Sequence, residues 1–211
     1  AAIVDLGAYP HIQALHDQAN TKSSCPYAAN LTASAIKDVI DAYATANPGI
    51  KYVVLAGNDD QIPFFRYPDQ ALLGPEQNYD PPVADGTQSQ SSLRLNYILG
   101  QDEYGSTTSL SLRDGSLPIP NLSVGRLVET ASDMTAVIDA YLSTSNGVVT
   151  PRSSLVTGYD FLADSADAVQ SELVAGMNAT ANVRNDTLIT AATISPADPR
   201  SWTADDLLAE L

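Results

Sequence analysis

The sequence predicts an α/β protein with a mostly parallel sheet and helices on both faces. Two observations lead to this fold class. Short apolar runs that suit strands alternate with longer segments whose apolar residues recur at the helical period. In addition, the run YVVLA at 52–56 leads into Gly57, the stretch Asn58-Asp59-Asp60 and then Pro63, an order typical of the carboxyl end of a parallel strand.

The expected strands are short apolar and β-branched runs. They are residues 2–6, 50–56, 122–127, 154–159 and 187–191, with one more short strand within 97–115.

Five helices are expected between and after these strands. They begin at Pro10, Leu31, Thr130, Asp164 and Thr203. The second has Ile36, Val39, Ile40 and Tyr43 on one face and ends at Asn47-Pro48-Gly49. The third begins at TASD, which resembles a capping box with Asp as its last residue.

Two connections interrupt this alternation. Residues 20–30 are expected to be a loop, and residues 68–96 show no period and are rich in Pro, Gly, Gln, Ser and Asp. A loop as long as 68–96 is often functional. We expect a first α/β subdomain at 1–150 and the start of a second, incomplete one at 151–211.

The composition is acidic. Among 211 residues, 44% are hydrophobic, and 10 Lys and Arg stand against 25 Asp and Glu, for a net charge of −15. This charge repels polyphosphate, and no basic patch occurs, so nucleic acid is not an expected partner. No apolar run reaches the roughly 18 residues that a membrane span requires. An acidic surface keeps a protein soluble and can also attract Ca²⁺ or cationic partners.

Several catalytic motifs are missing from the sequence. The strand at 52–56 is followed by GNDDQI, which is neither a dinucleotide fingerprint nor a phosphate loop, and no G-x-S-x-G occurs. His11 and His16 lie five apart on one short helix, without a cysteine at zinc-ligand spacing. Cys25 is the only cysteine, so the chain has no internal disulfide. We expect packing or surface roles for all three.

Two acidic clusters could ligate Ca²⁺. They are Asn58-Asp59-Asp60 and Asp102-Glu103. Neither has a diagnostic spacing, and a solvated loop is the alternative for both.

Two segments, taken in order, resemble the gingipain-type cysteine peptidases. YVVLAGNDDQIPF is similar to the family's strand that ends in Leu-x-Gly-Asp and leads to Ile-Pro. PIPNLSVGRLVETASDMTAVIDAYL, residues 118–142, is similar to its segment of Pro, apolar strand, Gly-Arg, Thr-x-x-acid and helix. The Tyr-rich stretch NYILGQDEYG lies between them, as in the family. The resemblance covers residues 50–211, while residues 1–49 fit only as a strand–helix start.

The resemblance implies a caspase-like fold and a Cys–His dyad supported by an upstream acid. That acid corresponds to Asp160, at the end of the strand SLVTGYDF. A carboxylate at this end of a strand can orient an imidazole on the neighbouring strand. The alternative is an Asp that simply begins the next helix.

The chain also departs from the family pattern. Neither Gly-His nor Cys follows Asp160, so we expect the dyad beyond residue 211, in a longer protein of which this is the amino-terminal, inactive portion. Leu95-Asn96 stands before Tyr97 where the family often has Ser-Asp, which weakens an inherited metal or substrate role there.

The resemblance implies a bacterial, exported endopeptidase, extracellular or at the cell surface, that acts on peptides or proteins. No cofactor other than Ca²⁺ is suggested. The alternative is a non-catalytic binding or surface-assembly module on the same fold. A nucleotide-binding domain is disfavoured, because no phosphate loop is present.

Overall fold

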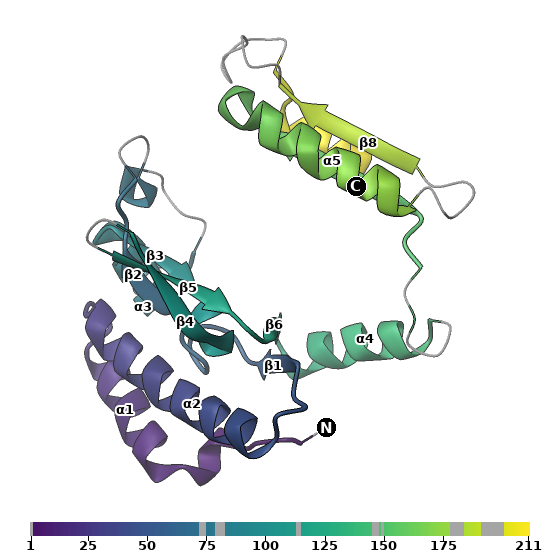
Figure 1. The fold of residues 1–211 in the computed structure, drawn as a ribbon. Coiled ribbons are helices and arrows are strands. Elements are labelled where there is room, and N and C mark those ends of the chain that lie inside the picture. Colours follow the sequence, from purple (N-terminus) through teal and green to yellow (C-terminus); the bar gives the residue numbers. More distant parts are fainter. Residues whose placement is uncertain are drawn as a thin grey trace. The chain divides into compact units, whose positions relative to one another are not determined.

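The structure is a computed structural model, and it contains two compact units (Figure 1). They comprise Ala1–Asp139 and Ala140–Leu211. The described residues are 2–71, 75–78, 83–112, 115–144, 148, 150–177, 184–190 and 201–211. No helix in these segments is long and apolar enough to cross a bilayer.

Two helices begin the first unit. They are α1 (Pro10–Thr21) and α2 (Pro26–Ala46), and each has proline in its first turn, where the missing N–H costs nothing. The buried face of α2 contains alanines and Ile36, and these small side chains let α1 approach closely. Helix α2 therefore begins five residues before Leu31, and the expected loop over 20–30 is reduced to residues 22–25.

The strand expected at 2–6 is wrong. Residues 2–5 have no regular structure, and Leu6–Ala8 form a 3-10 turn, η1. The Asp5 carboxylate caps this turn by accepting the Gly7 N–H at 2.8 Å, and Ile3 is exposed. An apolar run with no partner strand gains nothing from extended structure, so the local cap decides the conformation.

The first unit contains a parallel strand pair formed across a long stretch of sequence. Strand β1 (Tyr52–Ala56) pairs with β6 (Ser123–Leu127), with Leu55 opposite Arg126. Strand β2 (Phe65–Pro68) pairs antiparallel with β3 (Tyr97–Gly100).

The core of this unit lies between α1, α2 and these strands. Its buried members are Ile12, Ala33, Ala35, Ile36, Leu55, Ile62, Phe65 and Tyr104.

The segment 68–96 is not entirely loop. It contains the 3-10 turn η2 (Glu76–Asn78) and a helix, α3 (Gln88–Arg94), capped by Thr87 and buried on the face of Ser92 and Leu93. Residues 72–74 and 79–82 lie outside the described residues. The helix was missed because Gln and Ser show no hydrophobic period, and polar packing holds it in place.

A hairpin follows the turn η3 (Asp102–Gly105). Strand β4 (Ser106–Leu112) pairs antiparallel with β5 (Gly115–Pro120), with a bulge at the start of β4. The expected short strand within 97–115 therefore corresponds to two strands, β3 and β4.

The capping box before α4 (Ala131–Leu142) is confirmed. The Asp133 carboxylate accepts the Thr130 hydroxyl at 2.7 Å and the Thr130 N–H at 3.1 Å, and Thr130 Oγ1 accepts the Asp133 N–H at 3.2 Å. These bonds lower the pKa of Asp133, and the bond from the Thr130 hydroxyl has the largest effect.

We therefore expect Asp133→Asn to lower stability at neutral pH, with a difference from wild type that shrinks in acid. A lowered folded pKa means that the contribution is complete above the unfolded pKa, roughly 4, and is lost as the pH falls through the folded value. Urea midpoints from pH 7 to pH 3 test this. Asp139→Asn, on the same helix outside the box, should show no such loss. A difference that persists at pH 3 would contradict the expectation.

The second unit begins with β7 (Ser153–Gly158), paired in parallel with β8 (Arg184–Ile189). The turn η5 (Asp160–Leu162) leads into α5 (Ala163–Met177), and α6 (Ala204–Glu210) ends the chain. A Cβ on Gly158 would lie 2.6 Å from that of Ala166, so only glycine lets α5 pack this closely on β7.

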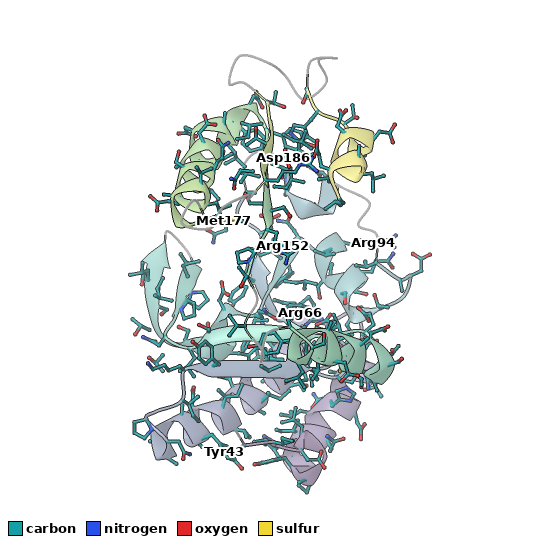
Figure 2. The ribbon with its side chains drawn as sticks, turned by 90° about the vertical axis from the view of Figure 1, so that its right-hand side faces the viewer. Tyr43, Arg66, Arg94, Arg152, Met177 and Asp186 are labelled. Atoms are coloured by element: carbon teal, nitrogen blue, oxygen red, sulfur yellow. The ribbon has the colours of Figure 1, made fainter. Side chains whose placement is uncertain are left out.

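Arg184 bonds Asp186 and Glu210, which connects β8 to α6; Figure 2 labels Asp186 and Met177 in this unit. The parallel pairs and their helices confirm the α/β class. In the described residues the sheets are small, each of two strands, and two of the pairs are antiparallel.

Candidate functional site

The loop after β1 turns sharply at Gly57. Its φ is +150°, a conformation that favours glycine, and a Cβ there would lie 3.1 Å from that of Gln61. The Gly57 N–H donates to the carbonyl of Leu127, the last residue of β6, at 3.0 Å. The polar residues 58–60 thus begin at the shared carboxyl end of β1 and β6.

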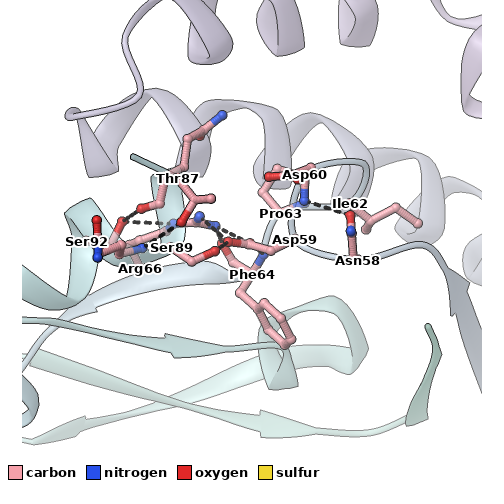
Figure 3. Close-up of polar contacts among 12 residues, drawn as sticks. Asn58, Asp59, Asp60, Ile62, Pro63, Phe64, Arg66, Thr87, Ser89 and Ser92 are labelled. Carbon is pink, nitrogen blue, oxygen red and sulfur yellow. Dashed lines mark hydrogen bonds and ion pairs between the residues drawn. The ribbon is translucent and has the colours of Figure 1, made fainter. Parts of the chain in front are cut away.

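Asp59 makes a forked ion pair with Arg66 (Figure 3). Nη1 and Nη2 of Arg66 lie 2.8 and 2.7 Å from the two Asp59 oxygens. The side chain of Arg66 is 0% exposed and that of Asp59 is 11% exposed, and Figure 2 labels Arg66 within the first unit. Asp59 also accepts the Phe64 N–H at 2.7 Å and the Ser89 hydroxyl.

Other elements complete the surroundings of Arg66. Nε donates to the Ser92 hydroxyl at 3.3 Å. The Asn30 side chain accepts the Arg66 N–H at 2.7 Å and donates to the Arg66 carbonyl at 2.9 Å. Asp59 therefore joins the β1 loop to β2 and α3, and its oxygens are already bonded to protein donors.

Asn58 and Asp60 shape the loop locally. Asn58 Oδ1 accepts the Asp60 N–H at 3.0 Å, and Asn58 Nδ2 donates to Glu129 at 3.3 Å. The Asp60 carbonyl bonds the His16 ring, while the Asp60 residue is exposed. The three residues of this cluster thus have different partners.

Arg126 was missed among the candidate residues, although the Gly-Arg of the family-like segment contains it. Its Nη1 donates to the carbonyls of Gly57, Asn58 and Ile62 at 2.8, 3.3 and 2.7 Å. Nε donates to Gln101 at 3.1 Å, and the guanidinium carbon lies 4.1 Å from the centre of the Phe64 ring.

Burial affects the Arg126 guanidinium. Burial lowers the pKa of this group, and the electrostatic interactions with Tyr104 and Asp59 act in the opposite direction. Nη2 is buried and has no hydrogen-bond partner among the described residues.

Asp102 and Glu103 lie apart from residues 58–60 in sequence, on η3. Glu103 Oε2 accepts the Tyr67 hydroxyl at 3.4 Å, and Asp102 is exposed. Burial, followed by the charge of Glu103, raises the pKa of Tyr67. Within the described segments, no three His, Cys, Asp or Glu side chains gather closely enough to hold a metal ion.

Asp160 begins η5 in the second unit, two residues after the last residue of β7. Its Oδ1 is buried and has no hydrogen-bond partner in the described part of the chain. The preceding Tyr159 stacks on Trp202, with ring centres 4.8 Å apart, and Trp202 Nε1 donates to the Gly158 carbonyl at 3.0 Å. Aromatic packing therefore fixes the turn that presents this carboxyl group.

Cys25 does not form a thiol–imidazole dyad with His11 or His16 in the described structure. Cys25 is exposed at the N-cap of α2. The His16 ring bonds Asn20 at 3.1 Å and the Asp60 carbonyl, and His11 lines a groove between α1 and α2. Neither imidazole bonds the thiol in the described structure.

Residues 12–203 match the sequence model of Peptidase family C25. The chain belongs to this family. The match includes both segments that resemble gingipain-type peptidases, and it confirms that resemblance. Comparison with curated proteins and with solved structures gave no match. As a region of the C25 family, the chain is assigned to a gingipain-like cysteine peptidase domain.

Proposed function

We propose that this chain is the amino-terminal portion of an exported C25 cysteine endopeptidase domain, in which Asp160 positions a histidine contributed by sequence after residue 211. The chain alone is then inactive. The observation that supports this role is the buried Asp160 oxygen without a hydrogen-bond partner among the described residues, at the carboxyl end of a parallel strand.

The physical reason concerns desolvation. A buried carboxylate oxygen without a donor loses its hydration and receives nothing in return, at a cost of roughly 1–3 kcal/mol or more. Such a group is retained where a donor from another element completes it. The N–H of an imidazole on the next strand is a suitable donor, because parallel strands place their carboxyl ends at one edge of the sheet.

The proposed chemistry is ordinary thiol acyl transfer. The thiolate attacks the peptide carbonyl carbon, and the C–N bond breaks as the imidazolium gives its proton to the leaving amine. Water then hydrolyses the thioester. Asp160 touches no reacting atom; it holds the ring in one orientation and favours the protonated form.

The downstream sequence provides the first test. A Gly-His within about 20 residues of Leu211 and a Cys about 30–40 residues later fit one further β–α unit between successive strands. Their absence would favour the binding-module alternative.

Kinetics of the extended protein provide the second test. We expect Asp160→Asn to lower kcat for a fluorogenic peptide by about 10²-fold with little change in KM, since a misplaced catalytic group costs about that much. The alkaline limb of the pH profile should move to lower pH, because loss of the carboxylate lowers the pKa of the histidine. Asp164→Asn, in the first turn of α5, is the matched control and should change neither.

The outcomes are separable. An unchanged kcat and pH profile for Asp160→Asn would reject the role of Asp160. An extended wild-type protein that cleaves neither casein nor a mixed peptide library would reject the peptidase itself.

A further inference from the structure

The two outer edges of the β4–β5 hairpin differ in their protection against strand addition. Strand β5 has Pro118 and Pro120, which lack an N–H and block the pairing of another strand. Strand β4, STTSLSL, has neither proline nor charge, and in the described residues it pairs only with β5. Natural proteins usually blunt such an edge.

Pairing within the hairpin determines which backbone groups of β4 face outward. Ser109 lies opposite Pro118, which has no N–H to donate, and bonded pairs alternate along an antiparallel ladder. The N–H and C=O of Ser109 therefore point away from β5, and by the two-residue period so do those of Ser111. The bulge at Thr107, tied to Asn121 at 3.0 and 2.6 Å, leaves this part of β4 free.

An acidic groove is lined in part by the first four residues of β4. It is about 250 Å³ in volume and is lined by Lys37, Asp41, Glu103 and the four residues Ser106–Ser109. Lys37 is paired with Asp41 at 2.7 Å. Glu103 has no basic partner among the described residues, so the groove has one uncompensated negative charge.

We propose that β4 binds an extended peptide segment by strand addition, with a Lys or Arg of that peptide in the groove beside Glu103. The main chain would pair with Ser109 and Ser111, and alternate apolar residues would lie beside Leu110, which is 53% exposed. A second copy of this chain is a poor occupant, because it would bring a second Glu103 and a net charge of −15 to the same edge. This site requires no Cys–His dyad, so it stands apart from the proposed peptidase activity.

Fluorescence anisotropy of the 211-residue chain with a fluorescein-labelled VKVKVKV peptide tests the proposal. The expected result is saturable binding. N-methylation of alternate peptide amides on the pairing side keeps charge and composition but removes the ladder bonds, and should weaken binding about tenfold or more. Ser109→Pro should do the same, while Ser116→Pro, which lies on β5 opposite Ser111, should not.

The charge is tested separately. Glu103→Gln should weaken binding by about 3- to 10-fold. Glu172→Gln, an exposed acid on α5, is the control and should leave binding unchanged. Amide exchange at Ser109 and Ser111 should slow at saturating peptide.

Three results would overturn the proposal: no binding, equal binding of the N-methylated peptide, or concentration-dependent dimerisation that Ser109→Pro abolishes while the peptide does not bind. If Ser109→Pro does not fold, as judged by circular dichroism, the N-methylated peptide still decides the question.

Discussion

Asp59→Ala should lower the free energy of unfolding by about 3–5 kcal/mol, because it leaves a buried cation without its partner. The Arg66 side chain is fully buried, and both Asp59 oxygens bond it. No other carboxylate among the described residues bonds Arg66, whose remaining side-chain partners are the Ser92 hydroxyl and the Phe64 carbonyl. Urea denaturation monitored by circular dichroism measures the effect.

The matched control is the adjacent carboxylate. Asp60→Ala removes an exposed side chain and keeps the carbonyl that bonds His16, so it should change stability by less than about 0.5 kcal/mol. The double variant Asp59→Leu/Arg66→Met should be more stable than Asp59→Ala, since neither charge is then left alone. Equal, small losses for Asp59→Ala and Asp60→Ala would show that the pair does not hold the loop.

Arg126→Met should destabilise the first unit by about 2–4 kcal/mol, since hydrogen bonds to a charged group are each worth about 1.5–3 kcal/mol. Its guanidinium bonds three carbonyls of the β1 loop and lies over Phe64. Methionine keeps much of the apolar stem but provides no donor. The stability of Arg126→Lys should lie between that of wild type and that of Arg126→Met, because an ammonium keeps the charge but cannot reproduce the planar set of guanidinium donors.

Arg94→Met provides the comparison for Arg126. Arg94 is 60% exposed on α3, with Nη2 4.0 Å from an exposed Asp85, so its loss should cost less than about 0.5 kcal/mol. Thermal denaturation of the three variants and wild type in the same buffer measures the series. If Arg126→Met and Arg94→Met lose the same amount of stability, the loop carbonyls are hydrated equally well without Arg126, and this arginine does not hold the loop.

The elements that sequence predicted best depend on near neighbours. The apolar face of Ile36, Val39 and Ile40 packs into the core, and the Thr130–Asp133 box forms as its spacing suggests. Helix α3 was missed because its buried face is polar. The strand at 2–6 was predicted on apolar content alone, without any indication of a partner strand.

The candidate site illustrates the same division. Sequence drew attention to Asp59 as an acid after a strand, with Ca²⁺ as one candidate ligand, but its partner is an arginine seven residues later, beyond a turn. Arg126 reaches a carbonyl 69 residues away. No local pattern predicts that contact, because it exists only once β6 has paired with β1.

By itself the sequence determined the α/β class, the family-like segments and the absence of a cysteine or histidine after Asp160, because these depend on residue order and short-range periodicity. Only the tertiary structure decided that Asp59 neutralises a buried arginine and that, among the described residues, Asp160 has an oxygen without a partner and β4 has an outer edge without a pairing strand. The reason is that partners of charged and backbone groups are set by strand pairing between distant segments, and burial then makes each pairing costly to lose.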